Sequence, residues 1–140
     1  MNEIIIEPFK RCGPIGFDES FSEISKKFPD HKEFKKTPFS KFVTSSIMSG
    51  NLHVYYSETG ACVGVEIFPP FKAVWDGIEF LKNDMESISR LLSSRNMAVE
   101  ISDSGVDIPG LGLSLYSHDF TESLKCSVDS VYVKLICEEQ

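Results

Sequence analysis

The sequence predicts an α+β fold with two antiparallel β-sheets, each of which carries one helix. Three observations lead to this prediction: two amphipathic helical patterns, several short segments of alternating apolar residues, and a weak likeness between the two halves of the chain. Because the chain has 140 residues, 41% of them hydrophobic, we expect a single domain (residues 1–140) with a sizeable core.

The first helix is predicted shortly after a turn at Gly13-Pro14. Ser20 and Glu23 have the spacing of a capping box, in which each side chain accepts a hydrogen bond from the backbone N–H of the other residue. Pro29 is expected to end the helix. The apolar face repeats at i, i+3 and i+7 and consists of Phe21, Ile24 and Phe28.

Strands are predicted on both sides of this helix, from their alternating or β-branched apolar residues: Ile4–Phe9, Phe42–Met48, Leu52–Ser57 and Val63–Phe68. Glu58-Thr59-Gly60 is expected to be the hairpin loop between the last two. Between the helix and these strands, Lys26–Lys41 contains six lysines and two acidic residues, a local charge of +4. We interpret it as a solvated connector, and DNA binding is the alternative interpretation.

The second half repeats this order of patterns. Phe71–Phe80 predicts a strand or short hairpin around Asp76-Gly77. A second helix is expected to begin at a capping box of Asn83 and Glu86 and to end near Asn96. Its apolar face consists of Met85, Ile88 and Leu92, and the strands predicted after it are Met97–Ser102, Gly110–Ser117 and Ser127–Ile136.

A weak internal repeat connects the two halves. Ile15 and Phe17 correspond to Ile78 and Phe80, and the later segment Leu52–Tyr55 resembles Leu113–Tyr116. The implied plan is strand–helix–three strands, present twice. Chance similarity between two β-α-β units is the alternative explanation.

The overall charge and the cysteines limit the classes of function. The net charge of −7 disfavours nucleic acid and anionic membranes as partners and favours a basic protein. The four cysteines have no metal-site spacing, so we expect free, mostly buried thiols. No segment has the pattern of a signal peptide or a membrane helix, and we expect a cytoplasmic protein.

Catalytic motifs are absent from the sequence, which contains no GxSxG, P-loop, HExxH or GxGxxG pattern. His118 and Asp119 are adjacent, but on a strand end their side chains would point apart and form no dyad. His53 is expected on the outer face of its strand, as a surface or sheet-pair residue rather than a catalyst. Asp103, Ser104 and Asp107 lack the spacing of a calcium loop and are interpreted as a polar turn. We therefore expect a protein that is not an enzyme and needs no cofactor or metal.

Acidic residues concentrate in the second half, where Asn96–Val131 contains six acidic residues and one lysine, a local charge of −5. Such a surface suits an inhibitor of a cationic nuclease, because complementary charge speeds the encounter and fixes the register. Solubility is the simpler explanation. The candidate partner-binding residues are four acids on loops or strand ends and two nearby aromatics: Asp103, Asp107, Asp119, Glu122, Tyr116 and Phe120.

The segment CGPIGFDES (Cys12–Ser20), followed by Glu23-Ile24, resembles a pattern of small bacterial immunity proteins, in which G-P-I-x-F-G-x-S opens a helix. The strands Leu52–Phe68 and Gly110–Tyr116 are similar to later parts of that pattern. Asp18 departs from it, since glycine is usual there. The resemblance is to immunity partners of contact-dependent growth inhibition and other polymorphic toxins, some of which are similar to Whirly nucleic-acid-binding domains.

This resemblance implies neutralisation of a cognate toxin domain by direct binding, and leaves the toxin unspecified. We therefore expect a non-enzymatic binding protein that occludes the toxin's active site or substrate face. A Whirly-like nucleic-acid-binding or regulatory domain, using Lys26–Lys41, is the alternative.

Overall fold

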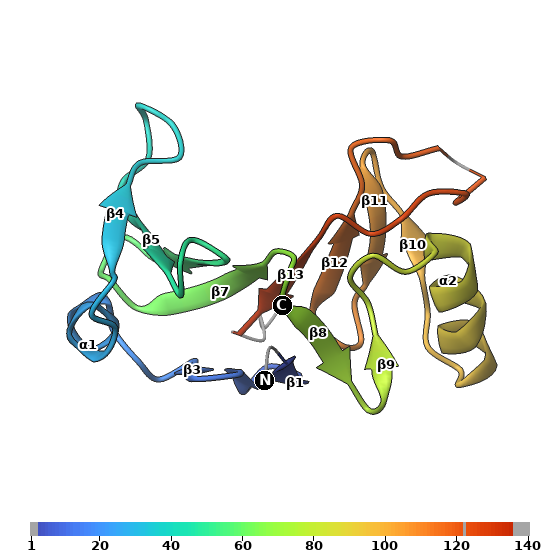
Figure 1. Cartoon of the computed structure of the whole chain (residues 1–140), viewed down its shortest axis with the longest axis horizontal. Coiled ribbons are helices and arrows are strands. Elements are labelled where there is room, and N and C mark those ends of the chain that lie inside the picture. The colour runs from blue at the N-terminus through green and yellow to red at the C-terminus, as the bar shows by residue number, and fades with distance from the viewer. Residues whose placement is uncertain (1–2, 122, 136–140) are drawn as a thin grey trace.

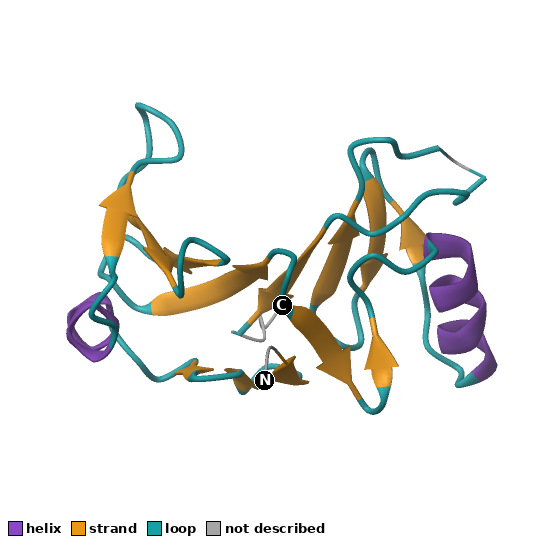
Figure 2. Cartoon of the chain, in the orientation of Figure 1, coloured by secondary structure: helices purple, strands orange, loops and turns teal. Residues whose placement is uncertain are grey.

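The computed structural model describes residues 3–121 and 123–135. In this part of the chain two helices lie at opposite ends of a long axis, with strands and loops between them (Figures 1 and 2). The α+β class, with two sheets in which most neighbours are antiparallel, is confirmed. The helices are α1 (Phe21–Lys27) and α2 (Met85–Ser94). The strands are β1 (Glu3–Glu7), β2 (Arg11–Cys12), β3 (Ile15–Gly16), β4 (Lys32–Phe34), β5 (Thr44–Ile47), β6 (Leu52–Tyr56), β7 (Cys62–Ile67), β8 (Lys72–Trp75), β9 (Ile78–Glu79), β10 (Glu100–Ile101), β11 (Gly105–Ile108), β12 (Leu113–Tyr116) and β13 (Ser130–Lys134).

The larger sheet has eight strands in the order β10-β11-β12-β13-β7-β6-β5-β4, and every neighbouring pair is antiparallel. It consists of two four-stranded meanders, β4–β7 and β10–β13, which join where β13 pairs with β7. The smaller sheet has the order β3-β2-β1-β8-β9, and its two halves meet where β1 pairs with β8 in parallel. Each half of the chain therefore contributes strands to both sheets.

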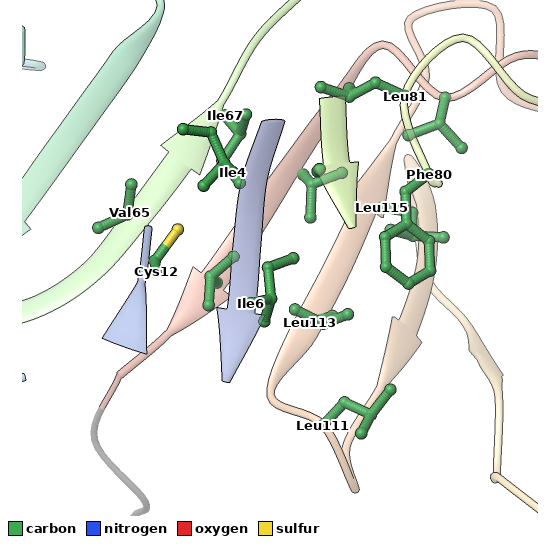
Figure 3. Close-up of a cluster of buried hydrophobic side chains, with 14 of the residues drawn as sticks. Ile4, Ile6, Cys12, Val65, Ile67, Phe80, Leu81, Leu111, Leu113 and Leu115 are labelled. Atoms are coloured by element: carbon green, nitrogen blue, oxygen red, sulfur yellow. The ribbon is translucent and has the colours of Figure 1, made fainter. Parts of the chain in front are cut away.

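The core lies between the two sheets. Ile4 and Ile6 of β1 are buried, and Figure 3 shows them beside Val65 and Ile67 of β7 and Leu113 of β12. The register of the large sheet aligns its apolar residues into one row across seven strands: Ile101, Val106, Leu115, Val131, Ile67, Leu52 and Ile47. Since side chains alternate between the faces of a strand, the residues next to this row point to the outer face.

Helix α1 begins as predicted. Ser20 is the N-cap, Glu23 completes the capping box, and the helix ends just before Phe28 and Pro29. Ile24 is fully buried, whereas Phe21 is only half-buried. The ring of Phe21 makes edge-to-face contacts with Phe42 and Tyr56, both at 5.4 Å between centroids, and these attach the helix to the sheet.

Helix α2 begins one residue later than predicted. The N-cap is Asp84, whose carboxylate accepts from the N–H of Ser87 at 2.9 Å, so the expected capping box of Asn83 and Glu86 is wrong. The amide of Asn83 instead donates to the carbonyl of Glu79, and aspartate is an equally good N-cap. Asn96 has φ of 64° directly after the last turn, as expected of a residue that stops a helix.

The repeat is visible in the order of the elements: each half has a short hairpin, a helix and a four-stranded meander. The predicted number of three strands after each helix is wrong, because β4 and β11 form additional strands in segments expected to be loops. β4 lies in the lysine-rich segment, and all three of its residues are exposed. β11 contains Asp107, so the expectation of a polar turn at this residue is wrong, and the strand pairs with β12 over four residues.

The predicted hairpin in Phe71–Phe80 is confirmed by β8 and β9, whose turn has positive φ at Asp76 and Gly77. The thiols of Cys12, Cys62 and Cys126 are free, and the first two are buried. Burial raises the pKa of Cys62 to about 12. Cys137 lies outside the described residues.

Candidate functional site

The outer face of the eight-stranded sheet is the surface on which functional side chains gather. The register aligns one residue of every strand into a row on this face: Glu100, Asp107, Ser114, Tyr132, Glu66, His53, Ser46 and Lys32. The row is acidic where it begins at β10 and basic where it ends at β4. The two edges of the sheet therefore differ in charge.

The acidic end is defined here by Glu100, Asp103, Asp107, Tyr116 and Asp119. Asp103 lies in the turn between β10 and β11, and Asp119 lies in the loop after β12. The N–H of Ser117 donates to the carbonyl of Ser104 at 3.1 Å. This hydrogen bond places the turn between β10 and β11 beside the loop that follows β12. Asp107 lies on the face itself, where it accepts from the hydroxyl of Ser114 at 2.8 Å.

The carboxylates of Asp103 and Asp107 form no salt bridge within residues 3–121 and 123–135. Tyr116 is the last residue of β12, and its side chain is 42% exposed. Tyrosine is enriched at protein interfaces, and an acidic surface is complementary to a positively charged partner.

His118 lies between two carboxylates at this end. Its Nδ1 is 3.0 Å from Asp129 Oδ2 and its Nε2 is 3.4 Å from Asp119 Oδ1. The expectation that His118 and Asp119 point apart is wrong, because the strand has ended and residues 117–120 form a turn. The hydrogen bond to Asp129 and the charges of Asp119 and Asp129 raise the pKa of His118.

Two predicted partner-binding residues differ from the rest. Phe120 is half-buried and packs against the core, so part of its ring is covered by the protein itself and is not accessible to a partner. Glu122 lies outside the described residues. The structure thus brings Asp103, Asp119 and Tyr116 to one end of the sheet, with Asp107 farther along the same face.

A polar network at the centre of the outer face was not predicted from the sequence. The carboxylate of Glu66 accepts from the hydroxyls of Tyr55 at 2.7 Å and Ser130 at 2.8 Å. Tyr132 lies over Gly64, where a Cβ would come within 2.0 Å of its hydroxyl oxygen. Burial and the neighbouring Glu66 raise the pKa of Tyr55. The only sequence signal was a charged residue on the outer face of an otherwise apolar strand.

The basic end is defined here by Lys32, Lys35, Lys36, Phe34 and Phe39. The ring of Phe34 forms an edge contact with His53, and His53 forms a second edge contact with Phe68. His53 is half-buried on the outer face, as predicted, and burial lowers its pKa. The ammonium of Lys36 lies 4.7 Å from the ring centroid of Tyr55, a distance typical of a cation–π contact.

Three shallow cavities of about 230, 310 and 560 Å³ border the described surface. The smallest adjoins the basic end and is lined by Lys36, Lys41 and Tyr55 among others. Residues 3–121 and 123–135 contain no group of three or more His, Cys, Asp or Glu side chains that could hold a metal ion. Neither helix of this part is long and apolar enough to cross a membrane.

No protein-family model, curated protein or solved structure matches this chain.

Proposed function

We propose that this chain is a non-enzymatic inhibitor that binds a cognate toxin domain, a cationic nuclease, in the bacterial cytoplasm. The observation that carries the proposal is the acidic end, where Asp103 and Asp107 have no cationic partner among the described residues and Tyr116 is exposed. The resemblance of Cys12–Ser20 to toxin-immunity proteins supports the same proposal from the sequence.

The mechanism is occlusion. A nuclease binds phosphates through Lys and Arg side chains, and unpaired carboxylates on a rigid sheet end are complementary to them. Long-range attraction accelerates the encounter, while Tyr116 supplies apolar contact area once the surfaces meet. Access of nucleic acid to the toxin is blocked because the inhibitor covers the same positive surface.

The genetic context provides a first test. The gene immediately upstream is expected to encode a larger protein with a variable C-terminal toxin domain, and a neighbouring gene of unrelated content would count strongly against the proposal.

The direct test measures capture of that toxin domain by charge-reversal variants. Asp103→Lys and Asp119→Lys are each expected to slow association and to reduce its dependence on salt. Glu7→Lys, an exposed reversal on the smaller sheet, is the matched control and should leave the rate unchanged. Equal association rates for all three variants and the wild type would refute the role of the acidic end.

Binding of single-stranded nucleic acid is the second candidate function. It is favoured by the basic end, where Phe34, Tyr55 and Lys36 combine partly exposed rings with positive charge. The net charge of −7 opposes it, and we expect no sub-micromolar binding of a labelled single strand at low salt. Tight, salt-sensitive binding that is lost in Lys32→Ser/Lys35→Ser would favour this second function.

A further inference from the structure

Both edges of the eight-stranded sheet are open in the described part of the chain. β4 and β10 are the terminal strands of the sheet order, and each is paired on one side only. The side chains of all three residues of β4 and of both residues of β10 are exposed. The unpaired N–H and C=O groups of such strands can hydrogen-bond to another chain.

The two edge strands run in opposite directions. Every neighbouring pair in the sheet is antiparallel and the sheet has an even number of strands, so β4 is antiparallel to β10. A second copy placed in the same orientation would therefore present its β10 antiparallel to β4 of the first. The alternation of strand direction would continue across the junction without interruption.

The charges of the two edges are complementary. The basic end combines Lys32, Lys35 and Lys36 with one acidic residue, Glu33, whereas Glu100 and Asp103 at the β10 edge are both acidic. Lys32 and Glu100 are the two terminal residues of the same row on the outer face, so the continued register would place them opposite each other. Opposite charges across two strands stabilise pairing, and the like charges of two identical edges oppose it.

Exposed apolar side chains accompany these charges. Seven large hydrophobic residues of the described chain are exposed, and three of them lie at the two edges. Phe34 (38%) and Phe39 (90%) belong to the basic end, whereas Ile101 (56%) is the last residue of β10.

The outward position of Phe39 is fixed by its turn. The N–H of Phe39 donates to the Thr37 hydroxyl at 3.2 Å, and the N–H of Thr37 donates to the Ser40 hydroxyl at 3.1 Å. The loop that carries this turn extends away from the body of the molecule (Figure 1). The ring is therefore available to a second molecule.

We propose that the protein associates head to tail with second copies of itself, β4 of one copy pairing with β10 of the next. The interaction is weak, since the paired strands have only three and two residues. It is heterologous, so assemblies grow by addition and each keeps one free acidic end. This inference goes beyond the proposed function, although a toxin bound at the acidic end would compete with a second copy.

The test is sedimentation velocity of the full chain over a range of concentrations. Raising the salt from about 0.01 M to about 1 M shortens the Debye length from about 30 Å to about 3 Å, and we expect the association constant to fall about tenfold or more. A protein that stays monomeric at millimolar concentration in low salt would overturn the proposal, and so would association that salt does not weaken.

A pair of neutralised variants tests the geometry. Lys32→Ser/Lys35→Ser removes charge from the β4 edge and Glu100→Ser/Asp103→Ser removes it from the β10 edge, so each variant alone should remain monomeric. Mixed in equal amounts they should form a dimer and stop, because one intact edge of each kind remains. Lys10→Ser/Lys72→Ser, at exposed positions of the smaller sheet and its first turn, is the matched control and should associate like the wild type.

The remaining outcomes are equally decisive. Association that both neutralised variants retain, or a mixture that stays monomeric, would show that the contact lies elsewhere. Toxin capture is measured separately with Lys32→Ser/Lys35→Ser, whose acidic end is intact. Loss of self-association with normal capture supports both proposals, whereas intact self-association in a wild type that captures no toxin refutes only the proposed function.

Discussion

Replacement of Gly105 by alanine is expected to disrupt the second meander. Gly105 is the first residue of β11 and pairs with Tyr116, and a Cβ at this position would lie 1.8 Å from the carbonyl oxygen of Leu115. Ordinary contact begins at 3.4 Å, so β11 and β12 would have to separate locally by about 1.6 Å. A backbone hydrogen bond stretched by that amount is broken.

The cost follows from what the separation removes. Loss of two ladder hydrogen bonds costs about 1–3 kcal/mol in total. Partial exposure of the buried side chains of Val106 and Leu115 adds about 1–2 kcal/mol. We therefore expect Gly105→Ala to lower the free energy of unfolding by about 2–5 kcal/mol.

Gly110→Ala is the matched control, because a Cβ there meets only the terminal methyl of Met97, which can move. Its free energy of unfolding should stay within about 0.5 kcal/mol of the wild type. Urea denaturation followed by circular dichroism gives both values. A Gly105→Ala protein as stable as Gly110→Ala would refute the strand pairing on which the calculation depends.

Three further predictions concern the helices and the histidine at the acidic end. Ile88→Ala, at a buried position of α2, should cost about 2–5 kcal/mol in urea denaturation, and an unchanged midpoint would contradict the burial. Asp84→Ala should cost about 1 kcal/mol by removing the N-cap, whereas Asn83→Ala should cost clearly less. Because the folded-state pKa of His118 is raised, its stabilisation should be complete below about pH 6.5, the unfolded value, and should be lost as pH rises through the folded pKa. Thermal unfolding across that window should show this loss, and His118→Gln should remove it. The acid limb, where Asp129 is protonated, should become smaller but persist, because the backbone N–H of residue 118 still donates to Asp129.

Several local features could be predicted from the sequence because the residues that decide them are neighbours in the chain. The Ser20–Glu23 capping box and the β8–β9 hairpin at Asp76-Gly77 depend on contacts within a few residues. The buried position of Ile24 could be predicted from the helical spacing of the apolar residues around it. Even there the competition between Asn83 and Asp84 for the N-cap was decided by geometry, since both residue types suit the position.

The tertiary structure alone decided how the two halves join and what surface they form. The pairing of β7 with β13 and of β1 with β8 connects residues 64 to 70 positions apart in the chain, and backbone hydrogen bonds carry no sequence signature that identifies their partner. β11 was not predicted for a related reason. Gly105 is typical of a turn in the sequence, whereas in the structure it lies in a strand, where the carbonyl oxygen of Leu115 leaves no room for a Cβ. Composition located the acidic residues in the second half, but only the register placed Glu100 and Lys32 at opposite ends of one row. Side-chain direction along a strand follows from a period of two, whereas the relative position of distant strands follows from packing of the whole core.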